Sequence, residues 1–259
     1  MRGVTVTIYA GIDIGSCTTK AVVIDQEDNI VGSHVRRSGV DYQSVAREVL
    51  DTALEGRAWD NIPIVATGYG RHTIDFAQEV KTEIACHAKG GYHHVSRALT
   101  LVDIGGQDNK VIKIDDNGHR LDFKMNRKCA AGTGTFIEEI AARMDIPLER
   151  LDDMARKAEK RVKIGSYCTV FASTEILSHI RAGVASEDLV RGVFESVVDR
   201  VMEMIPLADP LLLCGGVVQY FPIVADIFRE RIKGEIIVPP LPQLTGAYGA
   251  ALFARQSAG

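Results

Sequence analysis

The sequence predicts an α/β protein made of two duplicated lobes, because a short segment near its start recurs further along the chain. The segment from Gly11 to Lys20 reappears 90 positions later, ending at Lys110. In both copies an apolar run ends in Asp-Ile-Gly and a second apolar run follows, which is typical of a β-hairpin. Apolar residues at helical spacing follow each copy. The matched pairs are Asp13 and Asp103, Ile14 and Ile104, Gly15 and Gly105, Lys20 and Lys110, Ile24 and Ile114, and Asp25 and Asp115.

The turn of each hairpin predicts a phosphate site. Glycine at 15, 105 and 106 lets the backbone approach a bulky anion and adopt φ > 0, so that successive N–H groups can face phosphate oxygens. Asp13 and Asp103 end the preceding strands, where a carboxylate suits Mg²⁺ or its waters better than phosphate itself. Two facing hairpins would therefore hold a magnesium nucleotide. The sequence has neither a G-x-x-x-x-G-K-[ST] loop nor a G-x-G-x-x-G helix start, so neither a P-loop nor a dinucleotide site is predicted.

The first lobe is expected to cover residues 1–98. Asp41 is placed to cap the first helix of this lobe. The expected elements are strands at 7–14, 19–25, 30–36 and 63–67, a helix over 41–55 and helical structure from Arg71 onward.

The second lobe is expected to cover residues 99–259, beginning with the repeated hairpin. Asn117-Gly118 is a strong signal for the turn into its third strand. The strand at 211–214 runs into Gly215 and Gly216, which would place bare backbone beside a flat adenine ring; a plain tight turn is the alternative. The expected elements are strands at 121–125, 211–214 and 235–238, and helices at 134–144, 147–158, 173–182, 186–205, from 217 to about 230, and 246–255.

Composition excludes several classes of protein. The chain has 259 residues, 46% of them apolar, a net charge of −4 and a pI near 6.0, with lysine and arginine scattered, so a nucleic-acid surface is not expected. No run of about 18 apolar residues and no signal-peptide pattern occurs, so we expect a cytoplasmic protein without a membrane span. The five cysteines favour free thiols for metal or redox work over a disulfide framework.

Several motifs together resemble one family. They are Lys128-Cys-Ala-Ala-Gly-Thr-Gly134, Asp103-Ile-Gly-Gly-Gln-Asp108 and Cys168-Thr-Val-Phe-Ala172, supported by 66–71 and 83–88. The family is that of the ATP-dependent activators of 2-hydroxyacyl-CoA dehydratases, which includes the ATPase subunits of benzoyl-CoA reductase. The duplicated hairpins, the late strand with its Gly-Gly turn and the Gly-Ala-x-Gly-Ala helix resemble the wider fold of actin, sugar kinases and heat-shock-chaperone ATPases. The resemblance covers the whole chain and implies two actin-like lobes around a nucleotide cleft.

The resemblance implies a homodimer that holds one [4Fe-4S] cluster on its two-fold axis, with Cys129 and Cys168 of each chain as ligands. From the residues alone, ordinary buried thiols are the alternative. Cys129 and Cys168 lie too far apart for the C-x₂-C runs of a self-contained cluster, which is consistent with a site that two chains complete. Cys17, Cys86 and Cys214 are not expected to be ligands.

The resemblance also implies the nucleotide site. Asp103 and Gln107 would lie near the γ-phosphate and the attacking water. Gly215 and Gly216 would border adenosine. The residues expected to bind phosphate and Mg²⁺ are Asp13, Gly15, Ser16, Cys17, Thr18, Thr19, Lys20, Gly105, Gly106 and Asp108. The chain departs from the usual family pattern at Cys17, Thr135, Ser173 and Cys214, none of which removes a cluster ligand or a turn aspartate.

The implied function is ATP-driven electron transfer. The cluster would take one electron from ferredoxin or flavodoxin, and ATP binding and hydrolysis would drive its delivery to a dehydratase. An ATPase subunit of a benzoyl-CoA reductase-type enzyme is the nearest alternative. A small-molecule kinase of the same fold would use Asp103 as its base. An actin-like filament subunit would need head-to-tail contacts in place of a closed dimer.

Overall fold

The structure is a computed structural model, and it describes residues 7–59, 61–126, 130–165 and 168–259. The contacts between residues divide the chain into two compact units. The first contains the residues up to Ala98 together with Ile114–Arg120 and Leu244–Gly259, and the second contains Leu99–Lys113 and Leu121–Gln243. The expected division into 1–98 and 99–259 follows the sequence repeat, whereas these units follow packing.

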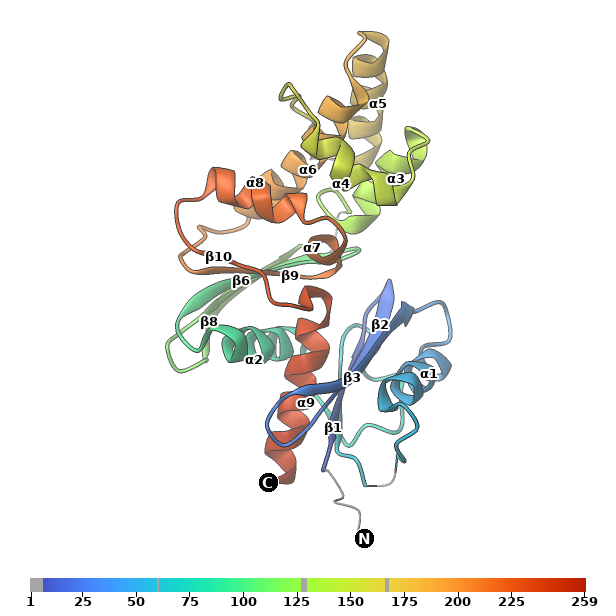
Figure 1. Ribbon diagram of the computed structural model, residues 1–259, viewed down its shortest axis with the longest axis vertical. Helices are drawn as coiled ribbons and strands as arrows, with labels where there is room; N and C mark the ends of the chain where they lie inside the picture. Colours follow the sequence, from blue (N-terminus) through green and yellow to red (C-terminus); the bar gives the residue numbers. More distant parts are fainter. Residues whose placement is uncertain (1–6, 60, 127–129, 166–167) are drawn as a thin grey trace. The chain divides into compact units, whose positions relative to one another are not determined.

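The first unit is built on a five-stranded mixed sheet (Figure 1). β1 pairs antiparallel with β2 and parallel with β4, so that Asp13 lies between Lys20 on one side and Thr67 on the other. In the order β3-β2-β1-β4-β5, the strands are Ile30–Arg37, Thr18–Ile24, Tyr9–Ile14, Ile64–Thr67 and Glu79–Val80.

Helices cover both faces of this sheet, which explains the unbroken apolar run in β2. Ala21 and Val23 pack into the core beneath α1 (Tyr42–Leu54), and Val22 and Ile24 pack against α9 (Thr245–Ala258). Strands that are buried on both faces lose the alternation of polar and apolar residues. As expected, the Asp41 carboxylate caps α1, accepting a hydrogen bond from the backbone N–H of Ser44 at 3.0 Å.

Small residues bring α9 against α2 (Glu83–Val95). A Cβ atom on Gly249 would lie 1.8 Å from the carbonyl oxygen of Cys86, and one on Gly90 would lie 2.3 Å from that of Thr245. Neither position can accept a side chain without moving a helix. The glycines at 90 and 249 therefore serve the packing of α2 on α9.

The second unit repeats the sheet layout (Figure 1). The hairpin of β6 and β7 corresponds to that of β1 and β2, and β9 pairs parallel with β6 as β4 pairs with β1. Asp103 lies beside Cys214 in this register. In the order β10-β9-β6-β7-β8, the strands are Ile236–Ile237, Leu211–Cys214, Leu99–Ile104, Asn109–Ile114 and Arg120–Asn126.

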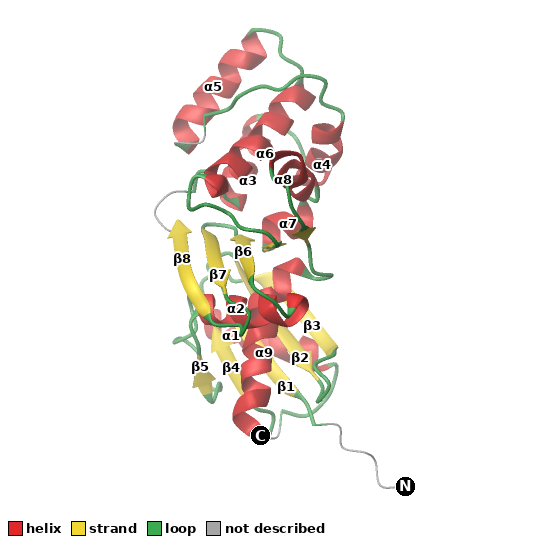
Figure 2. Cartoon of the chain, turned by 90° about the vertical axis from the view of Figure 1, so that its left-hand side faces the viewer, coloured by secondary structure: helices red, strands yellow, loops and turns green. Residues whose placement is uncertain are grey.

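Six α-helices are described in the second unit (Figure 2). Among all described residues, no helix is both long and apolar enough to cross a membrane. The helices are α3 (Gly134–Arg143), α4 (Leu148–Arg156), α5 (Thr169–Arg181), α6 (Ser186–Met202), α7 (Gly216–Tyr220) and α8 (Ile223–Arg231).

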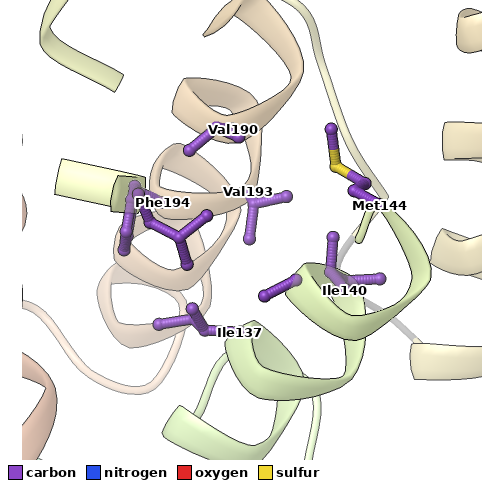
Figure 3. Close-up of a pocket in the computed structure, with 8 residues that line it drawn as sticks. Ile137, Ile140, Met144, Val190, Val193 and Phe194 are labelled. Atoms are coloured by element: carbon purple, nitrogen blue, oxygen red, sulfur yellow. The ribbon is translucent and has the colours of Figure 1, made fainter. Parts of the chain in front are cut away.

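Apolar side chains of α3, α4 and α6 face one another around a small void (Figure 3). Its volume is about 10 Å³, and its walls are apolar, with Ile137 and Ile140 from α3 facing Val193 and Phe194 from α6. A buried water needs about that much space and also polar partners. This void is therefore a small packing defect in the apolar core and not a ligand pocket.

Three expected boundaries were wrong. No helix begins at Arg71: residues 71–78 form turns, β5 follows, and α2 begins only after Thr82, whose hydroxyl accepts from Ala85 N at 3.3 Å. The helix expected to reach about residue 230 is broken into α7 and α8 before Pro222, because proline disfavours helical geometry in the residue that precedes it. α5 begins at Thr169 and not near 173.

Candidate functional site

The turn between β1 and β2 holds an aspartate and a lysine in direct contact. Lys20 Nζ donates to Asp13 Oδ2 at 3.1 Å, and both side chains are largely buried. Gly15 N donates to the carbonyl oxygen of Thr18 at 3.1 Å, which closes the turn. Ser16 is exposed at its tip, so the turn presents backbone to solvent above a buried carboxylate.

The turn between β6 and β7 has the same construction. Lys110 Nζ donates to Asp103 Oδ2 at 2.9 Å, and Gly105 N donates to the carbonyl oxygen of Asp108 at 2.9 Å. The Asp108 carboxylate also binds Lys110, at 3.0 Å. Gln107 is exposed at the tip of the turn. The sequence repeat is thus a repeat of geometry, with one Asp–Lys pair beneath each glycine turn.

A buried serine braces the first turn. Ser38 Oγ donates to the carbonyl oxygen of Gly15 at 2.6 Å, and Ser38 N donates to that of Cys17 at 3.0 Å. The hydroxyl of Thr19, which is fully buried, lies 3.0 Å from Ser38 Oγ. Thr19 was expected to bind the cofactor, and the structure shows that its hydroxyl forms a hydrogen bond with Ser38 inside the turn.

The start of α3 braces the second turn. Gly134 N donates to the carbonyl oxygen of Gly105 at 2.9 Å. Thr135 donates twice to that of Gly106, from its backbone N at 2.7 Å and from its hydroxyl at 2.7 Å. Two successive carbonyl groups of the turn are therefore bonded to the first residues of a helix.

A glycine in a left-handed conformation lies against each aspartate. Gly68 has φ +93° and Gly215 has φ +99°. A Cβ atom at Gly68 would lie 2.5 Å from Asp13 Oδ1, and one at Gly215 would lie 2.5 Å from Asp103 Oδ1. Sequence reasoning named Gly215 and missed Gly68. The signal is the register of the parallel strands, which places each glycine directly after the strand residue beside the aspartate.

The described cysteines differ in what they can bind. Cys168 is partly exposed and is the N-cap of α5, which places it at the N-terminus of a helix, where the helix dipole favours bound anions. Cys86 and Cys214 are fully buried, and burial raises the pKa of the Cys86 thiol to about 12. Cys17 lies in the first turn, partly exposed. Cys129 lies outside the described residues.

Helix α5 exposes apolar side chains immediately after Cys168. Val170 is 66% exposed and Phe171 is 75% exposed, and Leu177 and Ile180 further along the helix are also exposed. Large exposed apolar groups gathered on one helix are typical of a surface that another molecule covers.

Curated relatives resemble this chain over nearly its whole length. It is 40% identical to the 2-hydroxyisocaproyl-CoA dehydratase activator of Clostridioides difficile, over 94% of this chain and 93% of that protein. It is 36% identical to the (R)-2-hydroxyglutaryl-CoA dehydratase activating ATPase of Acidaminococcus fermentans, over 97% and 99% respectively. A more distant relative, at 25% identity over 95% and 93%, is one of the subunits of the benzoyl-CoA reductase of Thauera aromatica.

Solved structures agree with these relatives. The activator of the 2-hydroxyisocaproyl-CoA dehydratase from Clostridium difficile with bound ADPNP has a TM-score of 0.89 at 37% identity, covering 97% of this chain and 95% of that one. Component A of the Acidaminococcus fermentans (R)-2-hydroxyglutaryl-CoA dehydratase has a TM-score of 0.91 at 34% identity, covering 97% and 98%. A ROK family glucokinase from Streptomyces griseus, with a TM-score of 0.58 at 15% identity over 96% and 99%, shares the fold alone.

These comparisons confirm the predicted fold class, that of actin-like ATPases and sugar kinases, and the predicted resemblance to dehydratase activators. The model of the BadF/BadG/BcrA/BcrD ATPase family matches residues 10–254. That match covers nearly all of both compact units and includes both Asp–Lys turns and Cys168. The chain belongs to the BadF/BadG/BcrA/BcrD ATPase family.

Proposed function

We propose that this protein is an ATP-hydrolysing iron–sulfur activator that delivers a low-potential electron to a 2-hydroxyacyl-CoA dehydratase. The observation that carries the proposal is the pair of matching Asp–Lys turns, because an ATPase needs groups that hold phosphate and Mg²⁺ on a rigid frame. The relatives at 36 to 40% identity, which are named as dehydratase activators, support the choice of partner.

In this proposal each of the two turns supplies groups that bind the phosphates or Mg²⁺ of a magnesium nucleotide. Asp13 and Lys20 act with the backbone of the first turn on the phosphates and Mg²⁺. Asp103 orients the attacking water, and Gln107, exposed at the tip of the second turn, lies near the γ-phosphate. Gly215 and Gly216 border adenosine. The remaining residues proposed for the nucleotide site are Gly15, Ser16, Cys17, Thr18, Gly105, Gly106 and Asp108, with Thr19 supporting the first turn from within through its buried hydroxyl.

The residues fit a [4Fe-4S] cluster that two copies of the chain share. Such a cluster needs four thiolates, and Cys129 and Cys168 from each of two protomers supply four. Cys168 suits this role because it is partly exposed and lies at a helix N-terminus, where the helix dipole favours an anionic cluster. The exposed apolar side chains Val170 and Phe171 supply a surface that a second protomer would cover. When bound, the cluster supplies one-electron chemistry.

The proposed electron donor is a cytoplasmic ferredoxin or flavodoxin, and the substrate chemistry takes place on the partner enzyme. A benzoyl-CoA reductase-type partner is the second candidate, favoured by the relative at 25% identity. The dehydratase is preferred as the partner because the chain is more similar to the dehydratase activators, at 40% identity.

The test is the iron and acid-labile sulfide content of single cysteine variants purified without oxygen. At a two-fold axis, Cys168→Ala or Cys129→Ala removes two of the four ligands, so we expect the cluster to be lost and the dimer to weaken. Cys17→Ser is the matched control, because Cys17 is also partly exposed and is not a proposed ligand. Its iron content should equal that of the wild-type protein.

A full cluster in Cys168→Ala, or a cluster in a stable monomer, would contradict the shared site. A second assay separates the candidate partners: the protein is mixed with ATP, a reduced donor and a dehydratase or reductase component. Activation of the dehydratase alone supports the first candidate. A colourless protein that phosphorylates a small molecule would establish a kinase instead.

A further inference from the structure

Lys110 lies between two carboxylates in the second turn. Its Nζ is 2.9 Å from Asp103 Oδ2 and 3.0 Å from the nearest oxygens of Asp108. The lysine and Asp103 side chains are 5% and 6% exposed, and that of Asp108 is 27% exposed. One ammonium therefore joins the strand-end carboxylate to a carboxylate of the turn, in a place with little solvent.

The first turn lacks this second carboxylate. Lys20 contacts Asp13 at 3.1 Å, and the position that corresponds to Asp108 is occupied by Thr18. The Lys20 and Asp13 side chains are also more exposed than their counterparts, at 14% and 8%. The two copies thus share the Asp–Lys pair, and only the second extends it to the turn.

The Asp103 carboxylate is fixed from two sides. Lys110 binds Oδ2, while the backbone of Gly215 approaches Oδ1 so closely that a Cβ atom there would lie 2.5 Å away. Asp108 adds a third constraint, because its backbone carbonyl accepts from Gly105 N and its carboxylate holds the same lysine. Asp103 and the glycine turn are thereby held in one arrangement.

We propose that Lys110 is a positioning residue for ATP hydrolysis, fixing the direction of the Asp103 carboxylate relative to the turn. This role rests on the proposed function, in which Asp103 orients the attacking water. A buried carboxylate with its counter-ion removed would move or take up a different partner, because two unneutralised carboxylates at this spacing repel each other. A displacement of about 1 Å at a reacting group can cost about 10² in rate.

The experiment compares steady-state ATP hydrolysis and ATP-analogue binding in Lys110→Met, Lys110→Arg and the double variant Lys110→Met/Asp108→Asn. Lys110→Met keeps most of the length of the side chain and removes its charge, so we expect kcat to fall on the order of 10². The affinity for the non-hydrolysable analogue should change far less. Lys110→Arg keeps the charge and should recover part of the rate.

The double variant gives the sharpest readout. An asparagine at 108 cannot repel Asp103, so at saturating Mg-ATP the kcat of Lys110→Met/Asp108→Asn should exceed that of Lys110→Met alone. Lys20→Met in the first turn is the matched control and should weaken nucleotide binding more than it lowers kcat. All rates are expressed per folded protein, judged from thermal unfolding and circular dichroism.

Wild-type kcat per folded protein in Lys110→Met would overturn the positioning role and leave the ATPase function standing. A lower Tm with unchanged kcat would assign Lys110 to stability alone, which also overturns it. A wild-type protein that does not hydrolyse ATP would remove the proposed function, and this role would fall with it.

Discussion

The two glycine turns share their buried Asp–Lys pair and their glycines, and they differ in the residues that brace the turn. Each has a buried Asp–Lys pair, a glycine N–H that closes the turn and a left-handed glycine behind the aspartate. The first is braced by Ser38 from the chain after β3, and the second by the first residues of α3 and by the Asp108 carboxylate. The two copies thus share the buried Asp–Lys pair and the glycine against it, and they differ in the turn residues and in the groups that brace the turn.

The largest effect should be on ATP hydrolysis, and it should distinguish the role of Asp103 from that of Asp13. Asp103→Asn keeps the shape of the side chain and removes its charge, so we expect ATP hydrolysis to fall by about 10² or more while the fold and the cluster remain. Asp13→Asn should mainly weaken the binding of Mg-ATP. Phosphate release measured across ATP and Mg²⁺ concentrations distinguishes the two. Near wild-type turnover in Asp103→Asn would assign the water-orienting role to Gln107 or Asp13.

A smaller effect should appear at the left-handed glycines. Gly215→Val places a β-branched residue at positive φ and against Asp103 Oδ1, which should cost roughly 1–3 kcal/mol and weaken ATP binding. Gly68→Val should do the same beside Asp13, because that aspartate also belongs to a turn proposed to bind phosphate or Mg²⁺. Calorimetry with an ATP analogue and thermal unfolding measure both. Unchanged affinity in both variants would show that these glycines serve only the turns.

The smallest effect should come from the braces. Thr135→Val removes the hydroxyl that donates to Gly106 and keeps the backbone bond, so the loss of stability should be about 1 kcal/mol. Ser38→Ala leaves Gly15 O and the Thr19 hydroxyl without this partner and should cost roughly 1–3 kcal/mol. Denaturant unfolding provides the values. If the two braces serve different turns, the double variant should lose the sum of the two energies, and strong non-additivity would contradict their independence.

Much of this molecule follows from the sequence because the repeat preserves local chemistry. The 90-residue offset predicted both hairpins and both aspartates, since a strand, a glycine turn and a second strand are determined by adjacent residues. Gly68 and Gly215 do not share that offset, because each is brought to its aspartate by a parallel strand distant in sequence. Only the register of the sheet shows that they are equivalent.

Other features depended on partners that a linear pattern does not reveal. Ser38 is one of many hydroxyl residues, and its role as a brace appears only when β3 returns beside the first turn. Residues after Arg71 form turns and bends, and Ile74 and Phe76 pack against the core of the first unit from this irregular segment. The early start of α5 was also missed, and it moves Cys168 to the N-cap itself.

The packing of α9 has a consequence for how the chain is made. This helix supplies Ala247, Ala251 and Leu252 to the core under β2, although β1 and β2 lie far earlier in the chain. A ribosome releases a chain from its N-terminus, and domains usually fold in that order. The face of the first sheet that α9 covers therefore stays uncovered until α9 has been translated. The first unit is therefore completed only after the second unit has been translated, and an apolar sheet face left uncovered during that interval is prone to aggregation.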